Sequence, residues 1–324
     1  MKDKKMSLVD PGKLFFAICV LGIHTHAFPD STIVHSYIFA LAVPFFFICS
    51  GYFLGAKIGR AADISDYRQT LKKYGRHLAV PYIIWGVWYF CLDTALKVVS
   101  REMTFSQSLK SMALRWLVTS PGGGLWYIQA ILIIILLLLI TDKKSYRIVL
   151  TVIFVGLSVV PSVAVIPDQG VLKLILESHT FLWDSLYFLA GILIGEKGTQ
   201  WLKRNICICV FAVTLLIKVV LLANNILWFN RIVNMIMAAA LFGILFGITA
   251  SVSYERSLQI RRWSTIIYFT HMTVKYGVNI GLGMLKIDKP NIGFAISLII
   301  LLIYAVIVDK YARNKKIYKL LYAA

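Results

Sequence analysis

Two polar side chains, Lys13 and His24, lie eleven positions apart in an apolar stretch near the amino terminus. On an α-helix this spacing makes about three full turns plus 20°, so both side chains project from one face. The rise of about 1.5 Å per residue places His24 roughly 16 Å further along the helix, at membrane depth in a spanning segment. An imidazole there is costly and can exchange protons near neutral pH, and it therefore indicates a functional site.

Each of these residues also has a purely structural interpretation. Lys13 either extends to the cytosolic interface or faces a phosphate or a developing oxyanion at the positive end of a helix. His24 can equally be a hydrogen-bonded histidine inside a helix bundle. We expect Asp10 to cap the helix, with Pro11 at its first position, and to lie within reach of an ion pair with Lys13. His24 and His26 lack the i, i+4 spacing of a helical metal site, and no metal is expected.

The composition is that of a polytopic membrane protein, because 59% of the 324 residues are hydrophobic and the mean hydropathy is +0.77. No soluble segment of domain size interrupts the apolar stretches, so we expect a single membrane domain over 1–324. The formal net charge of +19 suits either nucleic-acid binding or a positive-inside membrane protein. The distribution of the charges decides between these two classes.

The apolar stretches predict an all-α fold with about ten membrane-spanning helices. We place them at roughly 12–28, 36–56, 77–99, 124–140, 147–166, 180–196, 206–224, 231–250, 263–284 and 292–309. With the amino terminus inside, Lys and Arg favour the cytoplasmic segments by roughly three to one over the external ones. We therefore expect both termini in the cytoplasm, and no nucleic-acid partner is needed to explain the basic charge.

One cytoplasmic segment is more basic than this topology requires. Arg68, Lys72, Lys73 and Arg76 lead directly into the third expected span. They either contact anionic lipid and orient the protein, or bind a phosphate-rich ligand from the cytosol. The basic tail at 310–319 is expected to contact anionic lipid headgroups.

Further ionisable residues fall inside the expected spans: Asp93, Asp184, Lys218, His271 and Lys275. His271 and Lys275 are spaced i, i+4 and share one helix face. So many ionisable groups at membrane depth predict a polar cavity inside the bundle. The residues alone leave open whether this cavity catalyses a reaction or transports a solute.

Six short motifs follow one another along the chain. They are Lys13-x10-His24, Phe46-Phe47-Ile48-Cys49-Ser50-Gly51, Arg76 followed by Pro81-Tyr82, Gly124-Leu125-Trp126-Tyr127-Ile128, Phe188-Leu189-Ala190-Gly191-Ile192-Leu193-Ile194-Gly195 and Ile267-Tyr268-Phe269-Thr270-His271. In this order they resemble the membrane-bound acyltransferase-3 family, which moves acyl groups onto surface carbohydrates and related acceptors. Lysine stands at position 13 where the family has arginine, which keeps the charge but loses the planar fork.

The resemblance implies an acyl-CoA donor, acetyl-CoA above all, that binds from the cytosol with its phosphates near Arg68, Lys72, Lys73 and Arg76. His24 would act as a general base on an acceptor hydroxyl or carry the acyl group transiently, and Lys13 would hold the CoA end or orient the site. A carbohydrate or lipid-linked acceptor would enter from the external side of a bacterial plasma membrane. The cavity is expected to include Asp93, Trp126, Asp184, His271 and Lys275. No metal or redox cofactor is implied.

Two other functions are compatible with the sequence. Polar groups at mid-membrane also suit a transporter or flippase of a small polar solute or lipid-linked intermediate. Some proteins with this membrane module are associated with amino-acid uptake linked to glycopeptide resistance. The third possibility is a non-catalytic scaffold of the cell envelope, in which the charged pairs only fix the packing of the helices.

Overall fold

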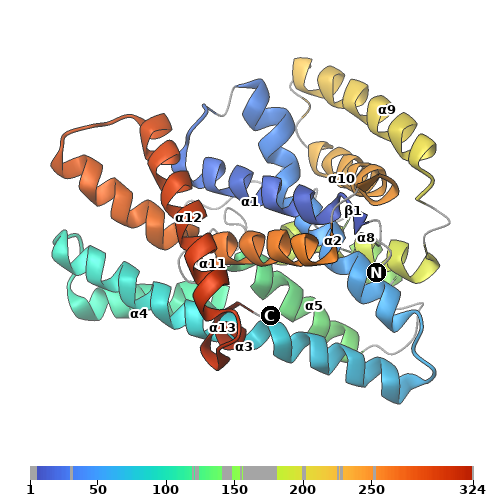
Figure 1. Ribbon diagram of the computed structural model, residues 1–324, viewed down its shortest axis with the longest axis horizontal. Coiled ribbons are helices and arrows are strands. Elements are labelled where there is room, and N and C mark those ends of the chain that lie inside the picture. Colours follow the sequence, from blue (N-terminus) through green and yellow to red (C-terminus); the bar gives the residue numbers. More distant parts are fainter. Residues whose placement is uncertain are drawn as a thin grey trace.

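The computed structural model describes residues 6–29, 32–118, 120, 124–140, 148–153, 155, 181–198, 202–224, 226, 229–250 and 253–322. This part of the chain is almost entirely helical (Figure 1). Its first elements are β1 (Met6–Ser7), α1 (Val9–Thr25), the π-helix η1 (Val34–Ile38), the 3-10 helix η2 (Phe39–Leu41), α2 (Ala42–Ile58), α3 (Ile64–Val99), α4 (Phe105–Val118) and α5 (Trp126–Ile140). The later elements are α8 (Phe181–Lys197), α9 (Arg204–Ala223), α10 (Asn230–Gly247), β2 (Thr249–Ala250), α11 (Tyr254–Met284), α12 (Pro290–Ala312) and α13 (Lys316–Tyr322).

Most helices follow the expected spans, whereas α4 and α13 lie outside them. Within the described residues each expected span coincides with a helix except 147–166, most of which lies outside them. In the part of the chain that the structure describes, five segments are long and apolar enough to cross a membrane: Val34–Ile58, α3, α9, α10 and α12. The protein is therefore a multi-pass membrane protein. Helices α1, α5 and α8 have only 17, 15 and 17 residues, so the total of ten spans and the side of the termini stay predictions.

Helix α3 is longer than a membrane is thick. Its 36 residues follow the N-cap residue Asp63, whose side chain accepts a hydrogen bond of 2.8 Å from the backbone N–H of Asp66. At about 1.5 Å per residue the helix is roughly 54 Å long, against about 30 Å of hydrocarbon. The basic residues at 68–76, which the sequence analysis assigned to a cytoplasmic segment before the third span, therefore occupy helical turns at the capped end of α3.

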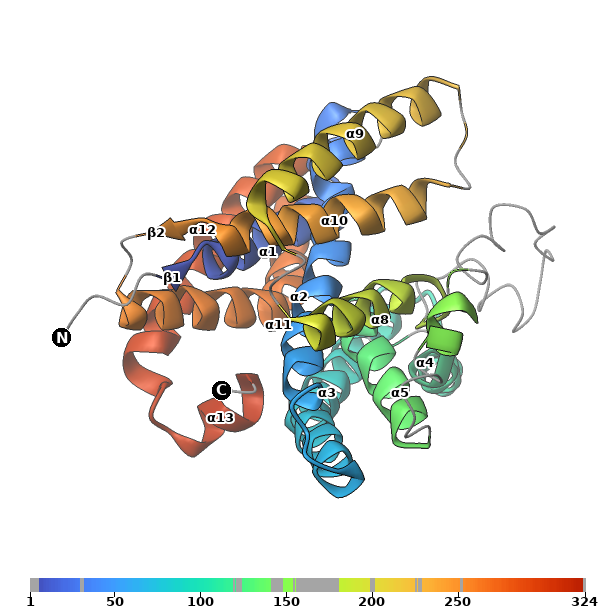
Figure 2. The ribbon, with the colours of Figure 1, turned by 90° about the vertical axis from the view of Figure 1, so that its right-hand side faces the viewer.

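Helices α2 and α8 cross with their backbones in contact (Figure 2). A Cβ atom added at Gly51 or Gly55 would lie 2.2 Å from a carbonyl oxygen of α8. One added at Gly191 or Gly195 would lie 2.5 or 2.3 Å from a carbonyl oxygen of α2. Both helices thus present glycines four residues apart to each other, which is how membrane helices approach closely.

Helices α1 and α11 run side by side in the same direction (Figure 1). The strand β1 ahead of α1 pairs with β2 just before α11, and Met6 lies opposite Ala250. These short strands fix the starts of both helices at one end of the bundle.

The C-terminal helix α13 folds back onto α3. Its Tyr318 and Tyr322 are each 2% exposed, and the indole N–H of Trp85 in α3 donates to the carbonyl oxygen of Leu321 at 2.9 Å. The end of the basic tail, expected at the lipid headgroups, is therefore packed against the bundle through its aromatic residues.

The glycine contact predicts how the fold responds to one added methyl group. In Gly51→Ala the new Cβ would meet the carbonyl oxygen of Phe188, so we expect a loss of about 1–3 kcal/mol in the free energy of unfolding. Gly277→Ala is the matched control, because nothing lies within 4 Å of its added Cβ. Thermal unfolding of the detergent-purified variants measures the difference. Equal melting temperatures for the two variants would contradict the close crossing of α2 and α8.

Candidate active site

His24 of α1 and His271 of α11 form an imidazole pair inside the bundle. Their ring centroids lie 5.0 Å apart, and the ring planes are inclined by 33°. His271 is 1% exposed and His24 is half-buried. The ring of His24 therefore meets a second titratable ring on the neighbouring helix.

The hydrogen bond of His271 assigns its tautomer. Its Nδ1 lies 2.6 Å from the carbonyl oxygen of Tyr268. Since a carbonyl oxygen can only accept, Nδ1 carries the hydrogen and Nε2 of the neutral ring has a free lone pair. This Nε2 is buried and has no hydrogen-bond partner among the described residues. A buried acceptor without a partner is unfavourable, so the atom is suited to bind a proton donor.

The segment before α5 closes one side of the pair. The hydroxyl of Tyr268 donates to the carbonyl oxygen of Gly124 at 2.8 Å. A Cβ added at Gly124 would lie 3.2 Å from a ring carbon of His271 and 3.4 Å from its Nε2. On the next turn the hydroxyls of Tyr127 and Ser50 are 2.6 Å apart. Motif residues of α2, α5 and α11 therefore converge beside the imidazole pair.

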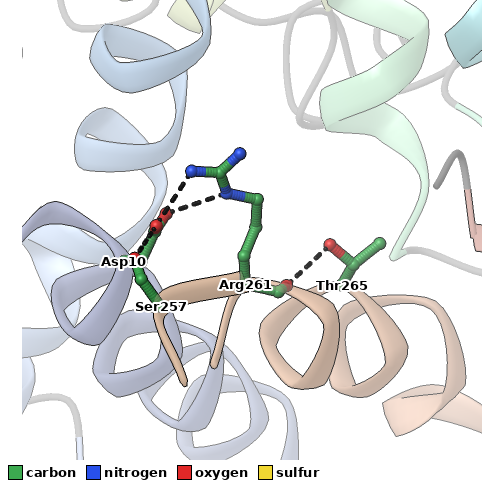
Figure 3. A network of polar contacts seen from close by, with 4 residues as sticks. All are labelled: Asp10, Ser257, Arg261 and Thr265. Atoms are coloured by element: carbon green, nitrogen blue, oxygen red, sulfur yellow. Dashed lines mark hydrogen bonds and ion pairs between the residues drawn. The ribbon is translucent and has the colours of Figure 1, made fainter. Parts of the chain in front are cut away.

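A buried carboxylate ties the start of α1 to the start of α11 (Figure 3). Asp10 accepts hydrogen bonds from Ser257 Oγ at 2.7 Å and from Arg261 Nε and Nη2 at 3.1 and 2.9 Å. The N-cap residue of α1 is Leu8, without a side-chain capping bond. The expectation that Asp10 caps α1 is therefore wrong, and its oxygens bond to α11 and not to Lys13.

This contact sets the register of the imidazole pair. Asp10 and His24 are fourteen residues apart on α1, and Ser257 and His271 are fourteen apart on α11. Equal separations of roughly 21 Å on two parallel helices bring both pairs together. The ion pair at one end and the rings further along thus belong to one helix interface.

Arg261 keeps the buried carboxyl ionised. Burial by itself raises the pKa of Asp10, but hydrogen bonds from Arg261 and Ser257 and the charge of Arg261 bring the pKa below its ordinary value. The ion pair is therefore fully formed at neutral pH.

Lys13 faces helix α2 nearer the start of α1. Its Nζ lies 4.8 Å from the ring centroid of Phe53. Eleven residues, or roughly 16 Å, separate it from His24, so the two side chains do not meet at one reacting atom. Lys13 therefore lies apart from the imidazole pair.

A basic groove of about 610 Å³ lies where α3 and α13 meet. Its polar lining includes Gln69, Lys72, Lys73, Arg76, His77 and Lys319. Three of the four basic residues expected to bind phosphates therefore line one groove, and Arg68 is not among its lining residues. Lys319, which the sequence suggested would contact lipid, adds a further cation.

Aromatic side chains pack between this groove and the level of the imidazole pair. From Arg76 to Tyr89, helix α3 rises roughly 20 Å. The Tyr89 hydroxyl donates to the carbonyl oxygen of Phe269, two residues before the imidazole of α11, at 2.5 Å. Between these levels the Trp85 ring stacks 6.0 Å from Phe269 and lies 6.1 Å from Tyr322 of α13. A layer of packed rings thus separates the groove from the pair along α3.

Comparison with known proteins places the chain in a family. The model of the acyltransferase-3 family, described as an acyltransferase domain, matches residues 9–309. The chain belongs to the acyltransferase-3 family. The match runs from the first residue of α1 into α12 and includes both helices that carry the imidazole pair.

Two amino-acid racemases of Enterococcus faecalis are similar to parts of this acyltransferase-3 domain. One is 30% identical over 132 residues, which is 39% of the chain and 18% of the racemase. The other is 23% identical over 235 residues, which is 63% of the chain and 30% of the racemase. The chain thus spans less than a third of the length of these curated relatives. No solved structure matches it.

Two expected cavity residues of the acyltransferase-3 domain lie near the imidazole pair. Lys275 is one helical turn beyond His271 on α11. Asp93 of α3 is close enough to Lys275 for their charges to interact. These two charged groups extend the polar region along α11 beyond the rings.

Two other expected cavity residues have different surroundings. Trp126 is 8% exposed, and its ring lies 5.9 Å from that of Phe47 in the apolar core. Asp184 of α8 faces Arg231 of α10, with Oδ1 and Nη1 3.9 Å apart. That ion pair joins a different pair of helices from the one that carries the imidazoles.

Sequence reasoning missed Arg261, Lys319 and the buried Tyr322. In the sequence, Arg261 is one of several positive charges in an expected cytoplasmic segment. No residue near it in the sequence indicates that it pairs with Asp10. The available signal was Asp10, because a carboxylate at the start of an apolar helix requires a cation from elsewhere in the fold. No sequence signal identifies the tail as part of the groove.

Removing Arg261 should destabilise the protein in a pH-dependent way. In Arg261→Leu, Asp10 keeps its burial but loses its cation, so its pKa rises above the unfolded value and the free energy of unfolding at pH 7 falls by about 1–3 kcal/mol. In the native protein the Asp10 pKa is lowered, so its contribution is complete above about pH 4 and is lost only below it. The deficit of the variant should therefore shrink as the pH falls toward about 4.

Thermal unfolding between pH 4 and 7 measures this deficit. The double variant Asp10→Leu/Arg261→Leu is the control, because without the carboxylate the pH dependence of the deficit should disappear. A deficit of Arg261→Leu that is the same at every pH would contradict the role of the buried carboxylate.

Proposed function

We propose that this protein transfers an acyl group, and acetyl in particular, from cytosolic acyl-CoA to a hydroxyl of an extracytoplasmic or lipid-linked carbohydrate in a bacterial plasma membrane. The observation that carries this proposal is the pair of His24 and His271 at 5.0 Å, in a chain of the acyltransferase-3 family. The half-buried imidazole of His24, next to the unpartnered nitrogen of His271, can supply the acid–base chemistry that acyl transfer needs.

The imidazole of His24 can both accept and donate the protons that this reaction transfers. The acceptor hydroxyl loses its proton as its oxygen attacks the thioester carbonyl, and the CoA sulfur leaves as a thiolate that takes up a proton. Neutral His24 can accept the first proton and donate the second. The lone pair on His271 Nε2 can accept a hydrogen bond from His24 and so stabilise the imidazolium that forms in between.

A covalent route uses the same residues. A ring nitrogen of His24 attacks the thioester carbonyl, the CoA thiolate leaves, and the acceptor hydroxyl then attacks the acyl-imidazole and releases the ring. Rapid quenching in denaturing detergent near neutral pH after mixing with radiolabelled acetyl-CoA separates the routes, because an acyl-imidazole hydrolyses quickly in acid. Label retained on His24 supports the covalent route, and its absence during turnover supports the general-base route.

The donor is assigned to the basic groove. Lys72, Lys73, Arg76 and Lys319 offer four cations to the phosphates of CoA at one end of α3. From there the pantetheine arm has to pass the packed rings of Trp85 and Tyr322 to reach the imidazole pair. Entry of the donor therefore requires α13 to shift, and Lys13 would contact the arm from the side of α2.

His24→Ala should abolish acyl transfer while leaving the fold intact. The measurement uses protein reconstituted in liposomes with radiolabelled acetyl-CoA and a glycan or lipid-linked sugar, and a loss of at least about 100-fold is expected for a missing general base. His35→Ala, on η1, is the control histidine and should keep its activity. Transfer that persists in His24→Ala would refute the assignment. Solute uptake that survives His24→Ala and ignores acetyl-CoA would instead support transport.

The groove predicts which part of the donor is recognised. In Lys72→Gln/Lys73→Gln the KM for acetyl-CoA should rise about tenfold with kcat little changed, because two phosphate contacts are lost. The KM for dephospho-acetyl-CoA, which lacks the 3′-phosphate, should rise less. Lys57→Gln removes a lysine at the end of α2 that does not line the groove, and should leave both values unchanged. An unaltered KM in the double variant would exclude the groove as the donor site.

A further inference from the structure

A second cavity, of about 460 Å³, lies where the end of α1 meets the hairpin between α11 and α12. In Figure 1 this hairpin lies on the left, away from the amino terminus. The polar residues of its lining are Thr25, His26, Asn279, Lys286, Asp288 and Lys289. Because Thr25 directly follows His24, the cavity reaches within one residue of the imidazole pair.

A stripe along α11 joins this cavity to the pair. His271, Lys275, Asn279 and Gly283 recur at every fourth residue, so they follow one side of the helix. The first contacts His24, and the last two line the cavity. A molecule seated in the cavity therefore borders a polar path toward the reacting groups.

The charged groups of the cavity are not neutralised within the protein. Among the residues that the structure describes, the side chains of Asn279, Lys286, Asp288 and Lys289 make no hydrogen bond or ion pair with another residue. Two lysines against one aspartate leave a positive excess. Such a lining favours a ligand that carries negative charge together with hydrogen-bonding groups.

Two backbone positions support a role in binding. His26 and Lys286 have φ values of 51° and 55°, and they are two of the four non-glycine residues with positive φ in the described part of the chain. Each stands just past the end of a helix, where glycine is the favoured residue. Strained positions of this kind cluster at ligand sites. Here they hold a basic side chain at the cavity where glycine would offer none.

We propose that this cavity binds the acyl acceptor, and that the acceptor is a carbohydrate that carries a carboxylate or a phosphate. The assignment to the acyl acceptor rests on the proposed function, whereas binding of an anionic carbohydrate can be measured without catalysis. A hydroxyl of the bound sugar would approach His24 along the polar side of α11.

Filling the cavity with a large side chain tests whether the carbohydrate binds there. Gly283 and Gly277 both lie on α11 with nothing within 4 Å of an added Cβ, but only Gly283 lines the cavity. The probes are a hexuronate disaccharide and a sugar phosphate, each titrated against the full chain in detergent. Gly283→Trp should lose binding of at least one charged probe by more than tenfold, and Gly277→Trp should bind as the native protein does. Unchanged binding in Gly283→Trp would overturn the proposed site.

Removing the charge tests the chemical class. The native protein should bind a charged probe at least about tenfold more tightly than the matched neutral disaccharide, and Lys286→Gln/Lys289→Gln should erase most of that difference. Lys110→Gln, on α4 outside the cavity, is the control. The two probes distinguish a carboxylate from a phosphate as the recognised group. Equal affinity for charged and neutral sugars, or no binding of either charged probe, would overturn the proposal.

The same proteins separate this proposal from the proposed function. Acetyl-CoA affinity, measured by calorimetry, should be unchanged in Gly283→Trp and in the lysine variant. If a charged sugar binds but no acyl group is transferred from acetyl-CoA, the cavity is a carbohydrate site and the proposed reaction is wrong. If acyl transfer to a neutral sugar is unchanged in Gly283→Trp, the proposed reaction is supported and the cavity is not the acceptor site.

Discussion

The contact between a buried carboxylate on α1 and a guanidinium on α11 sets the geometry on which the site depends. Asp10 is ionised because Arg261 and Ser257 hold it. Fourteen residues separate Asp10 from His24 on α1, and fourteen separate Ser257 from His271 on α11. The two imidazole rings therefore lie at the same level and contact each other. A buried ion pair at one end of the two helices therefore positions rings that lie about 21 Å away. The β1–β2 pairing anchors the same end of the same two helices.

The sequence alone predicted the apolar helices and singled out His24, one member of the imidazole pair, as a candidate site residue. Apolar runs of spanning length predict helices whatever the tertiary contacts, so the apolar part of each helix was predicted. Helices α3 and α11 begin well before the expected spans, because their first turns are polar. The depth of His24 marked it as unusual, since few explanations account for an imidazole at that level. His271 was identified as one of several ionisable residues at membrane depth and as the last residue of a family-like motif, but nothing in the sequence paired it with His24.

The pairing of distant residues could not be predicted in the same way. Asp10 has a plausible partner three residues away in Lys13, and local rules favour that choice. The structure instead uses Arg261, at 251 residues' separation, because α1 and α11 are neighbours only in the folded bundle. The same reasoning applies to the groove, where Lys319 joins the basic turns of α3. Hydropathy reports which segments are buried in the membrane but does not say which of them touch.

The glycine-to-glycine crossing of α2 and α8 has a consequence for biosynthesis. Gly51 leaves the ribosome well over a hundred residues before Gly191, and the helices between them enter the bilayer first. Until α8 arrives, the exposed backbone strip of α2 has only lipid or another early helix against it. The packing of α8 against α2, on which Ser50 lies, is thus completed late, so the candidate site cannot be assembled while the second half of the chain is still being synthesised.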